Sequence, residues 1–588
     1  MKKKLVSLLL VAVLLLTTVM AAACSQKTGT DTTAAGADTT AVDTTAGADT
    51  TAAAQEDLTV VTILCPSNNT QVQTPLRYSE NPRWESIPVV QTFYKMLEEV
   101  GVRLEYEVID NEQYNEAVKT RLMTGIDLPD IIANPGMSDV EAINAGEAGV
   151  IADVSALIDE YDADGSIKQY WNEKVGATIA GITTEDGNIW WMPYTYHREV
   201  LNDDGTPAAL TKNGVAYHVS IREDWLNALG QERKMFYTPE EVLDILTAFY
   251  ENDANGNGVK DEVIGNFSTS FYTGFESAFD MVYGLIGIRN DGKGVQCNLY
   301  NENFEEYVGF MQELYNRGLI DTTVLNGTDV NSANRGSTYA SYAGQSWAEA
   351  AITGYEDTAI YTPIIIDDDE GENGYSLYMV DANMMVLGKW FVNANSENLE
   401  AVIKVFDVLY TDESSFLSVW GEEGLTYDVD ENGNKIRRTG GDPSDPTYCT
   451  TFCSVLNNAL PNVYDITDNR VTFAATQAKP EKYQGKFDMI MYTFDNHENC
   501  TFQDGVAPYA MLTNSEMETV EALQTTLNTY IEEMMLKLIT GEYSLDDYPT
   551  YLAELESMGL KDYIAVFEAR HQRWVDYANE NGIETLYN

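Results

Sequence analysis

Residues 88–110 have the sequence PVVQTFYKMLEEVGVRLEYEVID. The first half predicts a helix that ends at Gly101, and the second half predicts a strand. Residues 58–66, LTVVTILCP, predict a buried strand ahead of this unit. Residues 111–136 repeat the plan, with a helix that ends at Gly125 and a strand after it. Strands that alternate with helices predict an α/β body with mostly parallel sheets.

The N-terminal segment predicts export from the cell. Lysines at residues 2–4 precede a largely apolar run at residues 5–20, and three alanines then lead to Cys24. This is the pattern of a secretory signal peptide over residues 1–23. Small residues directly before a cysteine resemble a bacterial lipobox, which implies cleavage before Cys24 and a lipid on that residue. Ordinary secretion with an incidental cysteine is the alternative.

A tether follows the cysteine. Residues 24–57 are rich in Thr, Ala and Asp, and they contain no aromatic residue. Such a segment buries too little apolar surface to fold, so we expect a disordered linker. A lipidated Cys24 and this linker together predict a globular body held at the extracellular face of a bacterial cell membrane.

Length and charge limit what the body can be. It runs from about residue 58 to residue 588, which is too long for a single hydrophobic core, so two lobes are expected. The chain has 93 acidic and 35 basic residues and a formal net charge of −58. A body this acidic repels nucleic acid and anionic lipid.

Local signals place several helices. Thr238 can cap a helix that has Pro239 in its first turn and Glu241 to complete a capping box. The apolar spacing of that helix predicts a buried face of Val242, Leu246 and Phe249. The chain from residue 515 onward is expected to be nearly all helix. We interpret Trp225 as a packing residue, with Arg222 and Asp224 paired beside it.

Seven strings together resemble one family. Their order and spacing are similar to those of the large extracellular solute-binding lipoproteins of carbohydrate ABC importers, family 1, in the branch that includes the alginate-binding and pectin-oligosaccharide-binding proteins. The strings are TGIDLPDII (124–132), DGNIWWMPY (186–194), IREDWLNALG (221–230), YTPEEVLDILTAFYENDANGNGVKDE (237–262), LYNRGLID (314–321), GEEGLTYDVDENGNK (421–435) and LITGE (538–542).

The resemblance implies a type 2 periplasmic-binding-protein fold, with two α/β lobes, a hinge, an interlobe cleft and a helical C-terminal region. On this basis lobe 1 would comprise about residues 58–195 and 375–440, and lobe 2 about residues 196–374 and 441–588. The implied function is to capture an oligosaccharide and deliver it to membrane permease subunits. Such a protein is a monomer and not an enzyme. A secreted glycoside hydrolase is the alternative, because it needs only two carboxylates and an aromatic cleft.

The ligand is expected to be an oligosaccharide without charge. The chain has 36 Tyr, 18 Phe and 9 Trp, whose rings suit the apolar faces of sugars, whereas basic residues that would bind a uronate are scarce. Trp347 matches the place where the family puts a tryptophan under a sugar ring. The other candidates for ligand binding are Tyr194, Trp191, Trp84 and Trp390.

Residues 252–262, NDANGNGVKDE, have most of a calcium loop. An EF-hand places ligands at positions 1, 3, 5, 7, 9 and 12 and a glycine at position 6. Position 12 is Ile264, which cannot bind calcium, so Glu262 at position 10 is the substitute. The family resemblance implies a structural calcium in such a loop, and a Gly/Asn turn without an ion is the alternative. The predicted ligands are Asp253, Asn255, Asn257, the Val259 carbonyl, Asp261 and Glu262.

A second acidic string, DVDENGNKIRR at residues 428–438, fails the same test. Ile436 stands at its ninth position and two arginines follow. Asn432 and Gly433 are typical of a hairpin turn, so we expect a hairpin here.

Overall fold

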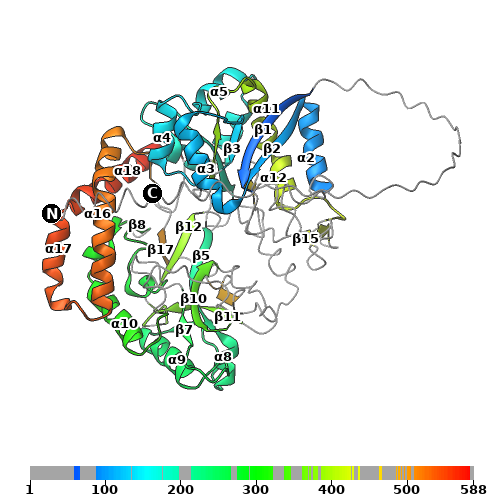
Figure 1. Ribbon diagram of the computed structural model, residues 1–588. Helices are drawn as coiled ribbons and strands as arrows, with labels where there is room; N and C mark the ends of the chain where they lie inside the picture. Colours follow the sequence, from blue (N-terminus) through cyan, green and yellow to red (C-terminus); the bar gives the residue numbers. More distant parts are fainter. Residues whose placement is uncertain are drawn as a thin grey trace, which may run out of the picture. The chain divides into compact units, whose positions relative to one another are not determined.

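The computed structural model describes most of the globular body (Figure 1). The described residues are 58–66, 88–133, 135–174, 176–197, 213–265, 274–289, 292–321, 337–345, 360–368, 370–372, 375–381, 386–425, 427–429, 435–437, 463–465, 485, 488–489, 492, 496, 500–504 and 509–582. Cys24 and the linker lie outside them, as do Trp84 and Trp347. No helix among the described residues is both long enough and apolar enough to cross a membrane.

The first sheet has six strands in the order β16-β4-β13-β3-β1-β2. Strand β1, which lies next to the edge strand β2, pairs in parallel with both β2 and β3, as the β–α–β pattern predicts. Gly101 and Gly125 end the two intervening helices with φ of +80° and +65°, values that glycine adopts most readily. The strands are β1 (Thr59–Pro66), β2 (Val102–Ile109), β3 (Ile131–Ala133), β4 (Met192–His197), β13 (Val386–Val392) and β16 (Val463–Asp465).

Helices cover this sheet, and α11 contacts both β1 and β2. The side of α11 that faces the core is apolar, with Val402 and Phe406 fully buried. The Tyr114 hydroxyl, on α3, donates to the main-chain oxygens of Leu64 and Ala133 and so joins a helix to two strands. The helices are α2 (Pro88–Glu99), α3 (Asn111–Thr124), α4 (Asp139–Glu147), α5 (Val154–Tyr161), α6 (Ser166–Lys174), α7 (Gly176–Ile182), α11 (Leu399–Leu409) and α12 (Asp412–Val419).

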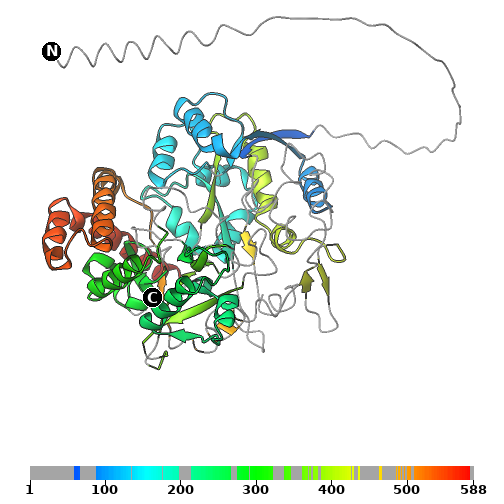
Figure 2. The same ribbon diagram turned by 60° about the horizontal axis from the view of Figure 1, so that its bottom comes forward.

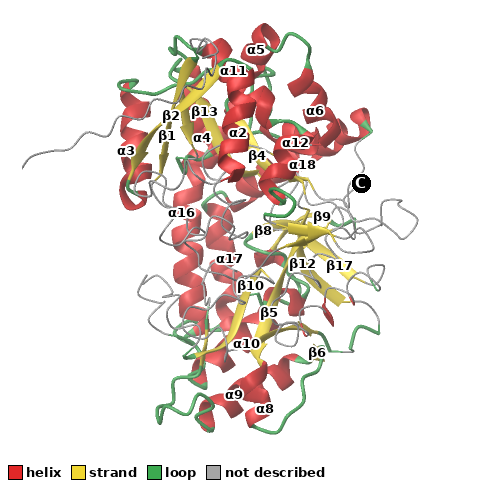
Figure 3. Ribbon diagram, turned by 90° about the vertical axis from the view of Figure 1, so that its right-hand side faces the viewer, coloured by secondary structure: helices red, strands yellow, loops and turns green. Residues whose placement is uncertain are grey.

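The second sheet is built around β5, which pairs antiparallel with β10, β11 and β12. Figure 3 shows β5, β10, β12 and β17 within it. The strands are β5 (Asn213–Arg222), β6 (Phe236–Tyr237), β7 (Val263–Ile264), β8 (Ile286–Arg289), β9 (Gly294–Cys297), β10 (Tyr339–Gln345), β11 (Tyr361–Ile366), β12 (Tyr375–Asp381) and β17 (Cys500–Asp504). Three helices, α8 (Glu223–Ala228), α9 (Pro239–Glu251) and α10 (Phe304–Asn316), accompany them, together with the short 3-10 helices η2 (Glu276–Phe279) and η3 (Asn298–Tyr300).

The expectation of mostly parallel sheets is wrong, because both sheets are mixed. In the first sheet β13 runs antiparallel to β3 and β4. Four residues of sequence separate β13 from β12, which is a strand of the second sheet. The parallel rule applies to strands joined by a helical crossover within one sheet, and no such crossover precedes β13.

Sheet membership also differs from the expected lobe boundaries at two strands. β12 belongs to the second sheet, although residues 375–440 were assigned to lobe 1. β16 pairs with β4 in the first sheet, although residues 441–588 were assigned to lobe 2. The chain therefore changes from the second sheet to the first between β12 and β13, and β16 belongs to the first sheet as well. The hairpin expected near residue 432 is confirmed, since β14 (Tyr427–Val429) pairs antiparallel with β15 (Lys435–Arg437).

The helical C-terminus is confirmed. It consists of α16 (Asn514–Ile539), the short 3-10 helix η10 (Leu545–Asp547), α17 (Tyr548–Ser557) and α18 (Leu560–Asn581). These helices gather in the orange and red part of Figure 2. α16 contacts α10, while α18 contacts both α7 and β9. The C-terminal helices thus contact elements that accompany each of the two sheets.

The start of α9 forms as the sequence predicts. The Thr238 side chain accepts a hydrogen bond from the Glu241 main chain at 3.1 Å, and the Glu241 carboxylate accepts one from the Thr238 main chain at 3.1 Å. The predicted face of Val242, Leu246 and Phe249 is buried. This helix leads directly into the calcium-like loop.

Candidate functional site

The calcium-like loop begins with a left-handed residue. Asp253 follows α9 at φ +50°, an uncommon conformation for a residue other than glycine. Its carboxylate accepts hydrogen bonds from the main-chain N–H groups of Asn257 at 3.0 Å and Gly258 at 2.9 Å. The chain therefore turns tightly around this carboxylate, as the first ligand of a calcium loop requires.

Polar side chains of the loop converge on Asp261. The side-chain amide of Asn255 donates to Asp261 Oδ1 at 2.8 Å, and that of Asn257 donates to both carboxylate oxygens at 3.1 and 3.0 Å. A 180° flip of either side-chain amide exchanges its nitrogen and oxygen, which have nearly the same shape. The amide oxygen then lies on the side of Asp261, where it could bind a cation together with the carboxylate. Amide and carboxylate oxygens are the ligands that calcium prefers, so these residues fit the ion.

Glu262 closes the loop from inside the protein. Its side chain is fully buried, and its carboxylate accepts hydrogen bonds from the main-chain N–H groups of Asn255 at 3.0 Å and Asp261 at 3.3 Å. Ile264, the residue at position 12, is buried in β7. The Glu262 carboxylate therefore faces the loop main chain, whereas the side chain at position 12 is an apolar core residue. Both positions agree with Glu262 as the replacement for the position-12 ligand. Val259 is 58% exposed at the tip of the loop.

The loop is attached to β10. The Asn255 side-chain amide also donates to the Ser337 main-chain oxygen at 3.0 Å. Directly after the loop, the main-chain N–H of Val263 donates to the Thr338 oxygen at 3.0 Å, and β7 then pairs in parallel with β10. Any ion in the loop would thus be held against the start of a strand of the second sheet.

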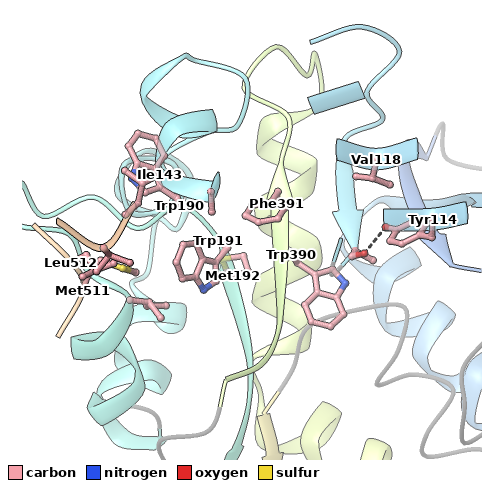
Figure 4. Packing of buried hydrophobic residues seen from close by; sticks show 14 of the residues in the cluster. Tyr114, Val118, Ile143, Trp190, Trp191, Met192, Trp390, Phe391, Met511 and Leu512 are labelled. Carbon is pink, nitrogen blue, oxygen red and sulfur yellow. Dashed lines mark hydrogen bonds between the residues drawn. The ribbon is translucent and has the colours of Figure 1, made fainter. Parts of the chain in front are cut away.

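Two of the predicted ligand-binding tryptophans are core residues in this structure (Figure 4). Trp191 is 1% exposed and Trp390 is 2% exposed. The Lys389 ammonium lies over the Trp191 ring, 4.7 Å from its centroid, and the Phe391 ring meets Trp191 edge-on. Neither indole has a face open to a sugar here, so the packing does not favour their assignment to ligand binding.

Tyr194 is the one predicted ligand-binding residue among the described residues that is not fully buried. Its ring is half-buried and meets Trp390 edge-on, with the centroids 5.9 Å apart. Trp84 and Trp347 lie outside the described residues, so their assignments stay predictions. Trp225 packs as expected, with the Arg222 guanidinium 4.1 Å from the ring centroid and paired with Asp224.

The structure brings together three carboxylates that the sequence did not group. Oxygens of Asp162, Asp164 and Asp407 lie within 4.8 Å of one another. Burial raises the pKa of the Asp407 carboxyl. The hydrogen bond from Ser166 lowers this pKa, whereas the two neighbouring carboxylates raise it further. Asp407 lies on α11, far along the chain from the other two, so no local motif could have indicated this cluster.

Comparison with known proteins identifies the relatives of the chain. No protein-family model matches it. It is 26% identical over 509 residues to the fructooligosaccharide ABC transporter substrate-binding protein FusA of Streptococcus pneumoniae serotype 4, a match that covers 83% of this chain and 87% of FusA. The predicted resemblance to solute-binding proteins of carbohydrate ABC importers is confirmed.

Solved structures of such solute-binding proteins have the same fold. FusA of S. pneumoniae in complex with kestose aligns with a TM-score of 0.63 and 21% identity, covering 90% of this chain and all of that one. The alginate-binding protein AlgQ2 without calcium ion aligns with a TM-score of 0.59 and 18% identity, covering 88% and 98%. The HMO-binding solute-binding protein from Bifidobacterium longum infantis also aligns with a TM-score of 0.59, at 16% identity. That alignment covers 88% of this chain and 99% of the other. The type 2 periplasmic-binding-protein fold is therefore confirmed for this chain. None of these proteins supports the glycoside hydrolase alternative.

Proposed function

We propose that this chain captures a neutral oligosaccharide of the fructooligosaccharide type and delivers it to an ABC importer. The match to FusA over most of both chains is the observation that carries the proposal. The net charge of −58 agrees with it, because an acidic body repels alginate, pectin fragments and other anionic sugars.

The mechanism is closure around the sugar. A ligand that contacts residues of both lobes binds the closed state more tightly than the open one and so raises the closed population. The permease subunits then recognise the closed state. No bond in the sugar is made or broken. A lipid at Cys24 and the linker up to residue 57 keep the monomeric body near the permease on the outer face of the membrane.

A structural calcium in the loop at residues 253–262 is part of the proposal. The loop residues support it, since the Asn255 and Asn257 amides donate to the Asp261 carboxylate, while the Asp253 and Glu262 carboxylates accept hydrogen bonds from main-chain N–H groups of the same loop. Two relatives point the same way, since one solved structure is an EF-hand mutant of FusA in complex with fructo-nystose and another is AlgQ2 without calcium ion. When bound, the ion would screen the repulsion between Asp253, Asp261 and Glu262.

Calorimetric titration of the purified body tests the function. We expect binding of kestose and nystose, no binding of oligogalacturonides or alginate fragments, and sugars that are recovered unchanged after incubation. New reducing ends would instead establish the glycoside hydrolase. Binding of uronic oligosaccharides with no binding of a neutral sugar would overturn the proposed ligand class.

The anchor needs its own experiment. Cys24→Ser removes the thiol that would carry the lipid, so we expect the variant to appear in the culture medium while the natural chain stays with the membrane fraction. Equal release of both chains would show ordinary secretion.

A further inference from the structure

The C-terminal helices contact both bodies of the protein, where a body means one sheet with the helices that accompany it. On the side of the second sheet the contact is interlocked. The Tyr548 ring, at the start of α17, stacks on Phe304 of α10 with the centroids 4.3 Å apart, and its hydroxyl donates to the Leu299 oxygen at 2.6 Å. Gln312 of α10 donates to the Leu538 oxygen near the end of α16 at 2.7 Å. Separate parts of the C-terminal helices are thus fixed to the second-sheet body.

The contact with the first-sheet body is of a different kind. It is made between α18 and α7. Trp574 and Ala578 of α18 and Ala180 of α7 form a small buried cluster that is separate from the main hydrophobic core. Beside it, a Cβ on Gly181 of α7 would lie 3.4 Å from the Tyr509 main-chain oxygen. Alanine and glycine surfaces carry no long side chains that interlock, and small sliding of packed helices is one of the ways in which lobes close.

The chain segment that leads into α16 runs past this cluster. Ala510 packs against the cluster itself, while Met511 and Leu512 are buried beside the first-sheet core residues that Figure 4 shows. Two arginines of α18 hold the segment from the other side. Arg570 Nε donates to the Ala510 oxygen at 2.8 Å, and Arg573 Nη2 donates to the Met511 oxygen at 3.1 Å. Long arginine side chains can keep such bonds while the helix turns slightly.

We propose that the contact between α7 and α18 is a joint. When the lobes close around a sugar, the C-terminal helices move with the second-sheet body, and the first-sheet body turns against α18. The inference rests on the proposed function, because it concerns the closure described there. A rotation displaces atoms least near its axis, so a contact that persists in both states should lie beside a segment that is tied to both bodies. Ala510 meets this condition.

Packing in the joint should therefore influence sugar affinity at a distance. The apparent affinity for a ligand depends on how much of the protein is in the state that binds it. A change in the joint that favours one arrangement of the two bodies alters that fraction without touching the sugar. A contact inside a single body has no such effect, because it is the same in the open and the closed state.

Ala578→Leu tests the inference, because it places a larger side chain between α18 and α7. We expect the Kd for nystose to change about threefold or more, since the added volume disfavours one arrangement of the bodies more than the other. Ala401→Leu is the matched control. Ala401 is also buried, but it lies on α11, whose contacts are within the first-sheet body. Both variants should have a lower melting temperature, and only Ala578→Leu should have a changed Kd.

Hydrogen exchange of the natural chain gives a second measurement that needs no variant to fold. When nystose binds, exchange of main-chain amides should change in residues 176–182 and 574–581, on the two sides of the joint. It should stay the same in residues 310–316 and 534–539, where α10 contacts α16.

Several results would overturn the joint while leaving the proposed function intact. They are nystose binding with an unchanged Kd in Ala578→Leu, equal changes of Kd in both variants, and exchange that does not respond at the joint or responds only where α10 contacts α16. A natural chain that binds no oligosaccharide would overturn the proposed function, and the joint with it.

Discussion

The Asn255 side-chain amide donates a hydrogen bond to the main-chain oxygen of Ser337 at 3.0 Å, across 82 residues of sequence. The bond joins the calcium-like loop to the segment that begins β10. The loop is therefore fastened to the second sheet through β10, and we expect it to influence folding stability more than sugar affinity.

Removal of calcium is expected to destabilise the protein. Without the ion the repulsion among the loop carboxylates returns, so a chelator should lower the melting temperature and excess calcium should restore it by mass action. At a free calcium concentration one hundred times the Kd, the gain in the free energy of unfolding would be about 2.7 kcal/mol. Differential scanning fluorimetry with and without a chelator measures it.

Asp253→Asn separates a specific site from general screening of charge. Asn tolerates the positive φ of this position, so the variant should fold but lose the calcium response. Its affinity for nystose in the presence of calcium should stay within a few-fold of that of the natural chain. Identical calcium responses in variant and natural chain would contradict the site, as would sugar binding that occurs only with the metal.

Truncation of two tryptophans should affect two different properties, folding stability for Trp390 and sugar affinity for Trp347. Trp390 is buried, so Trp390→Ala should lower the free energy of unfolding by about 3–5 kcal/mol. Trp347→Ala should instead weaken sugar binding by about 1–3 kcal/mol, by analogy with other stacking contacts of aromatic rings, and leave the melting temperature nearly unchanged. Titration calorimetry measures the sugar affinity of both variants, and thermal melts measure their stability. A large loss of stability with unchanged affinity would place Trp347 in the core.

The sequence was informative wherever neighbouring residues decide the structure. The helix at Thr238 has its cap, its proline and its apolar spacing within one short segment, and all three appear in the structure as expected. The calcium-like loop is of the same kind, because its predicted ligands are close in sequence and the hydrogen bonds that shape the loop join near neighbours in the chain.

Features that depend on distant pairing could not be predicted in this way. The antiparallel direction of β13 follows from the passage of the chain between sheets. Asp280 meets Ser376 across 96 residues, and no local motif marks either residue. Composition alone also could not tell that Trp191 is buried, because sugar sites and protein cores use the same aromatic residues.

The α9 capping box gives a stability test that is independent of any ligand. Thr238→Ala removes the side-chain acceptor of the Glu241 N–H and should lower the free energy of unfolding by about 1 kcal/mol. Thr238→Ser keeps that acceptor and should be close to neutral, because serine caps helices at least as well as threonine. Denaturant titrations of both variants give the comparison. Equal losses would mean that the threonine methyl group, and not the cap, is the stabilising part.

The three clustered carboxylates lead to a prediction about pH. Burial raises the pKa of Asp407 in the folded chain, and Asp164 and Asp162 raise it further. The folded state therefore favours the protonated form. That stabilising contribution is fully present below the ordinary aspartate pKa of about 3.9, and it is lost as the pH rises through the raised pKa. At neutral pH the ionised Asp407 should thus destabilise the fold.

Asp407→Asn should accordingly raise the melting temperature at pH 7, and its advantage should shrink as the pH falls toward 4, where the natural side chain becomes neutral too. The amide keeps an oxygen that can accept the Ser166 hydroxyl. Because the chain has a net charge of −58, removal of any carboxylate relieves some general repulsion. Asp186→Asn, in an exposed turn, measures that general part. Thermal melts in a chelator, which keeps metal ions away from the cluster, should show a larger gain for Asp407→Asn than for Asp186→Asn. Equal gains at every pH would mean that the cluster has no effect of its own.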